Sequence, residues 1–235
     1  MKLQAIILAL TLLGTAPGSA DPGTAYLLQD RREVWRIFDV DPDFAESIVW
    51  PEIERFWAPF DFVETSVNYI TSSFGGKDIE LSIGVFQMKP SFVEKLEKAW
   101  TDSRFADYYQ LRFDTSDNAE TRSKRIDRMS TEEWQVIYLA MFVRMMYSSY
   151  GSFNEAGERI RDGIDTYPLE EQLRMCANAY NRGCPWTEAG CGDIERIRYK
   201  MYAEVFPRAL SHASLKLQCY TTIAWEHYLS VTDQR

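Results

Sequence analysis

Acidic side chains among apolar neighbours are the first feature of this chain that could do chemistry. The segment FAESIVWPEIERF, residues 44–56, places Glu46 and Glu52 between aliphatic and aromatic residues. On a helix, Glu52 shares a face with several of those apolar residues. Apolar surroundings disfavour the ionised form of a carboxylic acid and raise its pKa, as a general acid working near neutral pH requires. The alternative is that Glu52 only forms a surface ion pair with Arg36 or Arg55.

Two later segments carry polar side chains that could take part in chemistry. Segment 81–92, LSIGVFQMKPSF, joins a flexible glycine to Gln87, whose amide can both donate and accept hydrogen bonds. Segment 176–183, CANAYNRG, ends a predicted helix with Tyr180 and Asn181. Taken singly, the two segments also fit a simple loop-to-helix connection and an ordinary helix C-terminus.

Helical spacing of apolar residues dominates the elements that must position these side chains. The predicted helices are 25–40, one that starts at a capping box of Ser91 and Glu94, one over 134–146 after a capping box of Ser130 and Glu133, one from Pro168 to about Asn181, 194–205 and 215–229. The helix over 134–146 is expected to be the most buried, because apolar residues occur almost all round it. Only 77–88 looks partly extended. We therefore predict a mainly α fold, one helical domain over 21–235 with at most a small β element.

The first twenty residues have the pattern of a secretory signal peptide. Lys2 supplies a positive start, an apolar run follows, and small residues lead to Ala20. The apolar run is too short for a transmembrane helix, which needs roughly 20 apolar residues. No later segment is predicted to cross a membrane. We expect an exported, periplasmic or secreted protein with 1–20 removed; the alternative is an uncleaved anchor.

The acidic composition bears on possible partners. The chain has 26 Lys and Arg residues against 35 Asp and Glu residues, a formal net charge of −9. Nucleic acid is not expected as a partner, because its phosphates require a basic protein surface. One basic cluster is predicted to be a solvated helix face, since acidic residues lie among its members, which are Arg122, Lys124, Arg125 and Arg128.

All four cysteines lie in the last third of the chain, at Cys176, Cys184, Cys191 and Cys219. In an oxidising compartment an even number suggests two disulfides, for which three connectivities exist. The short loop from Cys184 to Cys191 begins with Pro185 and favours that pair, which leaves Cys176 and Cys219 for a long-range bond. A zinc site is the less favoured alternative, because the chain lacks a CxxC pair and has only 2 histidines.

Taken in order, the three polar segments resemble those of the lysozyme-like lytic transglycosylases. Those enzymes carry a helix that ends in a catalytic Glu, then a G-L-M-Q-x-x-P segment and an A-Y-N-x-G segment. GVFQMKP (84–90) is similar to the second, and NAYNRG (178–183) is similar to the third. The chain also resembles a group of exported, poorly characterised bacterial lysozyme-like proteins, with weaker similarity at 219–228. The resemblance implies a lysozyme-like helical fold.

The resemblance leaves the identity of the acid open. Glu46 fits the pattern Glu-Ser-x-x-x-Pro of the transglycosylases, whereas in the poorly characterised group the acidic residue follows the proline, as Glu52 does here. We rank Glu52 first and Glu46 second, with little separation. Glu64, on an inserted segment before Gln87, is the third candidate.

The activity that the resemblance implies is cleavage of the β-1,4-linked glycan strands of peptidoglycan. A single Glu would protonate the leaving oxygen and then act as a base. The groove would be lined by Ser82, Gln87, Tyr180, Asn181 and Glu64. No metal and no organic cofactor is expected. The alternative is a non-catalytic binding or scaffold protein of the cell envelope that keeps a lysozyme-like fold.

Overall fold

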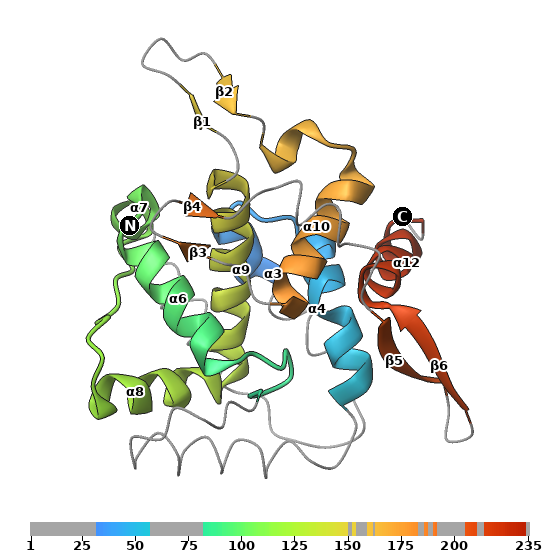
Figure 1. Ribbon diagram of the computed structural model, residues 1–235, viewed down its shortest axis with the longest axis horizontal. Coiled ribbons are helices and arrows are strands. Elements are labelled where there is room, and N and C mark those ends of the chain that lie inside the picture. Colours follow the sequence, from blue (N-terminus) through green and yellow to red (C-terminus); the bar gives the residue numbers. More distant parts are fainter. Residues whose placement is uncertain are drawn as a thin grey trace. The chain divides into compact units, whose positions relative to one another are not determined.

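A computed structural model describes the chain in several stretches. These are 32–56, 82–149, 152–153, 159–161, 163–182, 186–187, 190–191, 205–210 and 214–233. The fold is mainly helical (Figure 1), which confirms the predicted fold class at that level. The predicted signal peptide, 1–20, lies outside the described residues, as do Glu64 and Cys184.

The described helices and strands follow one another in a simple order. The helices are α3 (Arg32–Ile37), α4 (Pro42–Phe56), α6 (Pro90–Thr101), α7 (Arg104–Tyr109), α8 (Ala119–Met129), α9 (Glu132–Ser149), the 3-10 helix η1 (Ile164–Thr166), α10 (Leu169–Arg182) and α12 (Tyr220–Thr232). The strands form three antiparallel pairs, β1 (Ser152–Phe153) with β2 (Arg159–Arg161), β3 (Trp186–Thr187) with β4 (Gly190–Cys191), and β5 (Val205–Leu210) with β6 (Ser214–Cys219). The described stretches thus hold more β structure than the one small element expected.

The chain divides into two compact units. The first comprises Met1–Val40 and Phe56–Met141, and the second comprises Asp41–Arg55 and Phe142–Arg235. The boundary between residues 141 and 142 falls within α9. The prediction of one domain over 21–235 stays a prediction.

An aromatic core and the first half of α9 hold the first unit together. Phe38 stacks on Tyr109 with ring centroids 4.7 Å apart, and Trp100 lies against both rings. Trp35 Nε1 donates to the backbone oxygen of Val136 over 3.1 Å, which joins α3 to α9. Every residue from 135 to 143 is buried, so the prediction of a deeply buried helix over 134–146 is confirmed.

Three helices form the core of the second unit. In α12 the buried residues Tyr220, Ile223, Ala224 and His227 have the i, i+3, i+4, i+7 spacing of one helix face. This helix packs beside α10 (Figure 1), where Arg174 Nη1 of α10 donates to the hydroxyl of Thr222 over 3.1 Å. A hydrogen bond from Tyr220 of α12 to the backbone oxygen of Ile48 joins α4 to the same group of helices.

Neither of the two predicted capping boxes caps its helix. α6 begins at Pro90, and its N-cap is Lys89 rather than Ser91; the Lys89 side chain makes no capping bond. Proline suits the first helical position because its fixed φ is helical and it needs no amide partner. The next helix begins at Glu132, and Thr131 rather than Ser130 accepts the amide of Trp134, over 3.5 Å.

The last predicted helix, 215–229, begins too early. The helix itself is α12, and the residues before it form β6, in which Cys219 pairs with Val205 and Ser214 with Leu210. The segment SLKLQ alternates apolar and polar residues, which is the period of a strand and not of a helix. Of the helix predicted over 194–205, the described part is Val205, which is the first residue of β5.

Candidate functional site

Glu52 is a nearly buried carboxyl group in the last part of α4. Its residue is 8% exposed, and it directly follows Pro51, which lies inside the helix. Proline has no amide hydrogen to donate to the carbonyl four residues earlier, so regular α4 bonding is interrupted beside Glu52. A carboxyl group with so little solvent requires specific polar neighbours.

Two tyrosines from other helices of the second unit interact with this carboxyl group. Burial, followed by the charge of Glu52, raises the pKa of Tyr180 on α10 well above its ordinary value of 10.0. Burial, then Glu52, then Tyr180, raises the pKa of Tyr220 on α12 in the same direction. Because electrostatic effects of this kind fall with distance, both phenols lie within range of the Glu52 charge. We call Glu52, Tyr180 and Tyr220 the Glu52 cluster. Burial therefore keeps both phenols neutral at physiological pH.

Tyr220 fixes the turn of α4 that carries Glu52. Its buried hydroxyl donates to the backbone oxygen of Ile48 over 3.0 Å. Ile48 lies one helical turn before Glu52, so this bond joins the start of α12 to that turn. Sequence analysis missed Tyr220, although it begins the apolar i, i+3, i+4, i+7 face of α12 and lies in the weakly similar segment 219–228.

The second acidic candidate, Glu46, has a different neighbourhood. It is 5% exposed, and its Oε1 lies 3.4 Å from Nε2 of His227. The His227 ring stacks on Trp50, with centroids 3.9 Å apart and planes 9° apart. Both leading acids are therefore buried, but Glu52 lies beside two phenols whereas Glu46 lies beside an imidazole. A histidine partner suits a structural ion pair between α4 and α12 at least as well as catalysis.

A tight turn in the first unit carries Gln87. Ile83 and Met88 pair across it through N–H···O bonds of 2.8 and 3.1 Å. Both the backbone amide and the side-chain Nε2 of Gln87 donate to the oxygen of Gly84, each over 2.9 Å. The backbone of Gln87 has φ 52°, a left-handed value that costs energy for any residue with a Cβ. Such strain persists where the surroundings enforce it, which is common at functional sites.

Ser82 and Asn181 are the remaining predicted site residues that the structure describes. Ser82 is half-buried and directly precedes the turn that carries Gln87, in the first unit. Asn181 is half-buried near the end of α10, one residue after Tyr180, in the second unit. Tyr180 thus lies within electrostatic range of Glu52, while the predicted groove, which also includes Ser82 and Gln87, stays a prediction.

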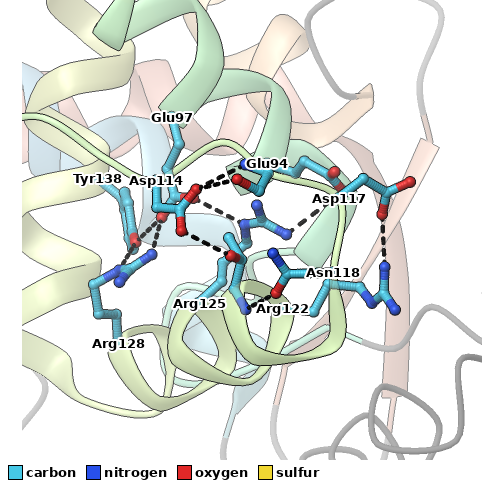
Figure 2. A network of polar contacts seen from close by, with 11 residues as sticks. Glu94, Glu97, Asp114, Asp117, Asn118, Arg122, Arg125, Arg128 and Tyr138 are labelled. Carbon is cyan, nitrogen blue, oxygen red and sulfur yellow. Dashed lines mark hydrogen bonds and ion pairs between the residues drawn. The ribbon is translucent and has the colours of Figure 1, made fainter.

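The basic cluster is only partly the solvated helix face that the sequence predicted. Lys124 pairs with Glu120 at the surface, with side chains 59% and 77% exposed. Arg125, in contrast, is buried and donates to Glu97 over 2.9 Å, as does Arg128 over 2.6 Å. Figure 2 shows these two arginines and Tyr138 converging on Glu97. The correction has a physical reason: Glu97 is fully buried in α6, and only paired charges are stable at such a position.

The expected long-range disulfide is not formed in the part of the chain whose side chains are described. Cys176 and Cys219 are both thiols. Cys176 is buried within α10, and the sulfur of Cys219 lies 3.3 Å from the hydroxyl of Thr221. The pairing of Cys184 with Cys191 stays a prediction, because Cys184 lies outside the described residues.

Two properties of the described residues bear on partners. None of their helices has the length and apolar character needed to cross a membrane. The same residues contain no group of three or more His, Cys, Asp and Glu side chains arranged to bind a metal ion.

Comparison of the chain with models of protein families, with curated proteins and with solved structures found no match.

Proposed function

We propose that this protein cleaves the glycan strands of peptidoglycan, with Glu52 as the single general acid and base. The observation that carries the proposal is the Glu52 cluster, in which a carboxyl group only 8% exposed lies beside the neutral phenols of Tyr180 and Tyr220. The sequence similarity at 84–90 and 178–183 supports the same activity, because Tyr180 belongs to the second of those segments.

The chemistry follows from the environment of Glu52. The neutral acid is the form that protonates the glycosidic oxygen as the bond breaks through an oxocarbenium-like transition state. The carboxylate left behind then removes a proton, either from a hydroxyl of the sugar itself, which closes an anhydro ring, or from water. The neutral phenols of Tyr180 and Tyr220 carry no negative charge that would oppose the charge of that carboxylate. General acid–base catalysis of this kind contributes about 10²–10⁴-fold to the rate.

Glu52 suits this role better than Glu46. Glu46 already has a side-chain partner, because its Oε1 lies 3.4 Å from Nε2 of His227. The neighbours of Glu52 are phenols that carry no positive charge. We propose further that the enzyme acts outside the cytoplasm, where its substrate lies, after removal of residues 1–20.

The experiment measures the release of soluble muropeptides from purified sacculi. The samples are the wild type, Glu52→Gln, Glu46→Gln, and the matched control Glu54→Gln, which alters a half-buried glutamate on the same helix. We expect Glu52→Gln to lower the rate by about 10²-fold or more, while Glu54→Gln keeps wild-type activity. Mass analysis of the products then separates anhydro from hydrolysed ends, which differ by one water.

Other results would change the assignment. A large loss with Glu46→Gln and none with Glu52→Gln would transfer the catalytic role to Glu46. A wild type that binds sacculi without releasing muropeptides would overturn the enzymatic proposal and support the non-catalytic scaffold.

A further inference from the structure

Gln135 is a buried amide side chain in a helix that is otherwise apolar at its centre. It lies on α9 and is 1% exposed. Burial of an amide is costly unless its polar atoms are bonded. Both are: Oε1 accepts the backbone N–H of Phe86 over 2.8 Å, and Nε2 donates to the backbone oxygen of Met129 over 2.7 Å. Gln135 therefore joins the turn over 83–88 to the last residue of α8.

The same side chain explains why the turn contains a glycine. A Cβ placed on Gly84 would lie 1.4 Å from Nε2 and 2.8 Å from Oε1 of Gln135. Gln135 cannot move aside without losing its bonds to Phe86 or Met129. Gly84 also has φ 72°, which is unfavourable for any other residue. The close approach of Gln135 and the absence of a side chain at position 84 therefore require each other.

These contacts control the conformation of Gln87. The Phe86 amide that Gln135 holds directly precedes Gln87, and Gly84 supplies the oxygen that accepts both the backbone and side-chain N–H groups of Gln87. Gln135 thus contacts two of the residues that set the left-handed backbone and the side-chain direction of Gln87. A side chain that is held in place beforehand loses less conformational entropy when a ligand binds.

We propose that Gln135 is a positioning residue that presents Gln87 to the glycan strand. This inference rests on the proposed function, and it assigns a role to a side chain outside the three sequence segments that suggested that function. Gln135 acts through the turn and does not itself touch the sugar. Because Gln87 would bind the ground state and the transition state alike, its loss of position should raise KM and leave kcat nearly unchanged.

The test compares steady-state kinetics on soluble peptidoglycan glycan fragments for four proteins. Gln135→Met keeps the side-chain length but removes both hydrogen bonds, and Gln87→Ala removes the presented group. The matched control is Gln172→Met, because Gln172 likewise accepts one bond, from Tyr147, and donates one, to the oxygen of Tyr167. We expect KM to rise about tenfold in Gln135→Met and in Gln87→Ala, with kcat within about twofold of wild type.

Three further readouts separate positioning from general stability. The double variant Gln135→Met/Gln87→Ala should show no further rise in KM, because both changes act on one interaction. Gln172→Met should lose a similar amount of thermal stability while keeping the wild-type KM. Amide hydrogen exchange at Phe86 should become faster in Gln135→Met alone, since its acceptor is removed.

The outcomes are distinguishable. A wild type without glycan cleavage overturns the proposed function and, with it, a glycan-positioning role. An active wild type with an unchanged KM in Gln135→Met overturns the role of Gln135 and leaves the proposed function standing. Equal KM changes in Gln135→Met and Gln172→Met would reduce Gln135 to a structural residue.

Discussion

Replacement of Glu97 by glutamine should destabilise the protein far more than replacement of a surface glutamate. Glu97 is 0% exposed, and its two oxygens accept from Arg125, whose side chain is 3% exposed, and from Arg128, whose side chain is 21% exposed. Figure 2 shows that Tyr138 donates to the same carboxylate. Glu97→Gln would therefore leave Arg125 in the interior without its main counter-charge.

The size of the effect follows from burial. Loss of one partner of a buried ion pair costs about 3–5 kcal/mol, because the remaining charge has been removed from water. Glu94 stays 3.6 Å from Arg125 and is 45% exposed, so it offsets part of the loss. We expect about 3 kcal/mol, which for a chain of this size lowers Tm by about 6–12 °C.

The assay is thermal or urea denaturation followed by circular dichroism. The matched control is Glu120→Gln, which breaks the exposed pair with Lys124 and should change stability little, because solvent screens such a pair. Equal losses of stability in Glu97→Gln and Glu120→Gln would refute the argument, since they would show that burial adds nothing to this network.

Three further predictions concern the turn, the Glu52 cluster and alkaline pH. Gly84→Ala should lower the free energy of unfolding, measured by urea denaturation, by about 3 kcal/mol. In a Gln135→Ala background the loss should be only about 1–2 kcal/mol, because left-handed backbone strain alone remains. An equal loss in both backgrounds would contradict the contact with Gln135. Tyr220→Phe should lower the free energy of unfolding by about 1 kcal/mol, because it removes the bond to α4. It should also lower kcat and change KM less. A change confined to KM would count against that role. The free energy of unfolding should fall as pH rises above 10.0, because the unfolded chain loses phenol protons there while the folded protein keeps them. The protons are kept on the tyrosines whose pKa burial raises, which are Tyr138, Tyr147, Tyr180 and Tyr220. Phenolate absorbance should therefore appear for these groups only on unfolding, and their titration in the native state would refute this.

Local patterns in the sequence were sufficient to identify most of the helices. Continuous apolar residues over 134–146 indicated a buried helix, and Pro168 marked the start of α10, because these signals depend on neighbours along the chain. The same reasoning failed at 214–219, where a period of two was assigned to a helix and the partner strand 205–210 was not recognised. Strand pairing depends on a distant segment, which no local window contains.

For the candidate site, residue types marked Glu52 as a possible acid and Gln87 as a possible sugar-binding group. The resemblance added Glu46 as a second acid, and Tyr180 and Asn181 as groove residues. Neither could rank the two acids, because the ranking depends on which helices pack against α4. Tertiary structure decided that Glu52 lies beside Tyr180 and Tyr220 while Glu46 lies beside His227.

What the sequence determined by itself was the helical character and the set of polar residues able to do chemistry. Only the tertiary structure decided which of them are neighbours. Gln135 illustrates the physical reason: it lies 49 residues after Phe86, and nothing at that spacing in the sequence marks the bond between them. The environment of a side chain, and hence its charge state and hydrogen bonds, is set by residues that folding brings together from distant parts of the chain.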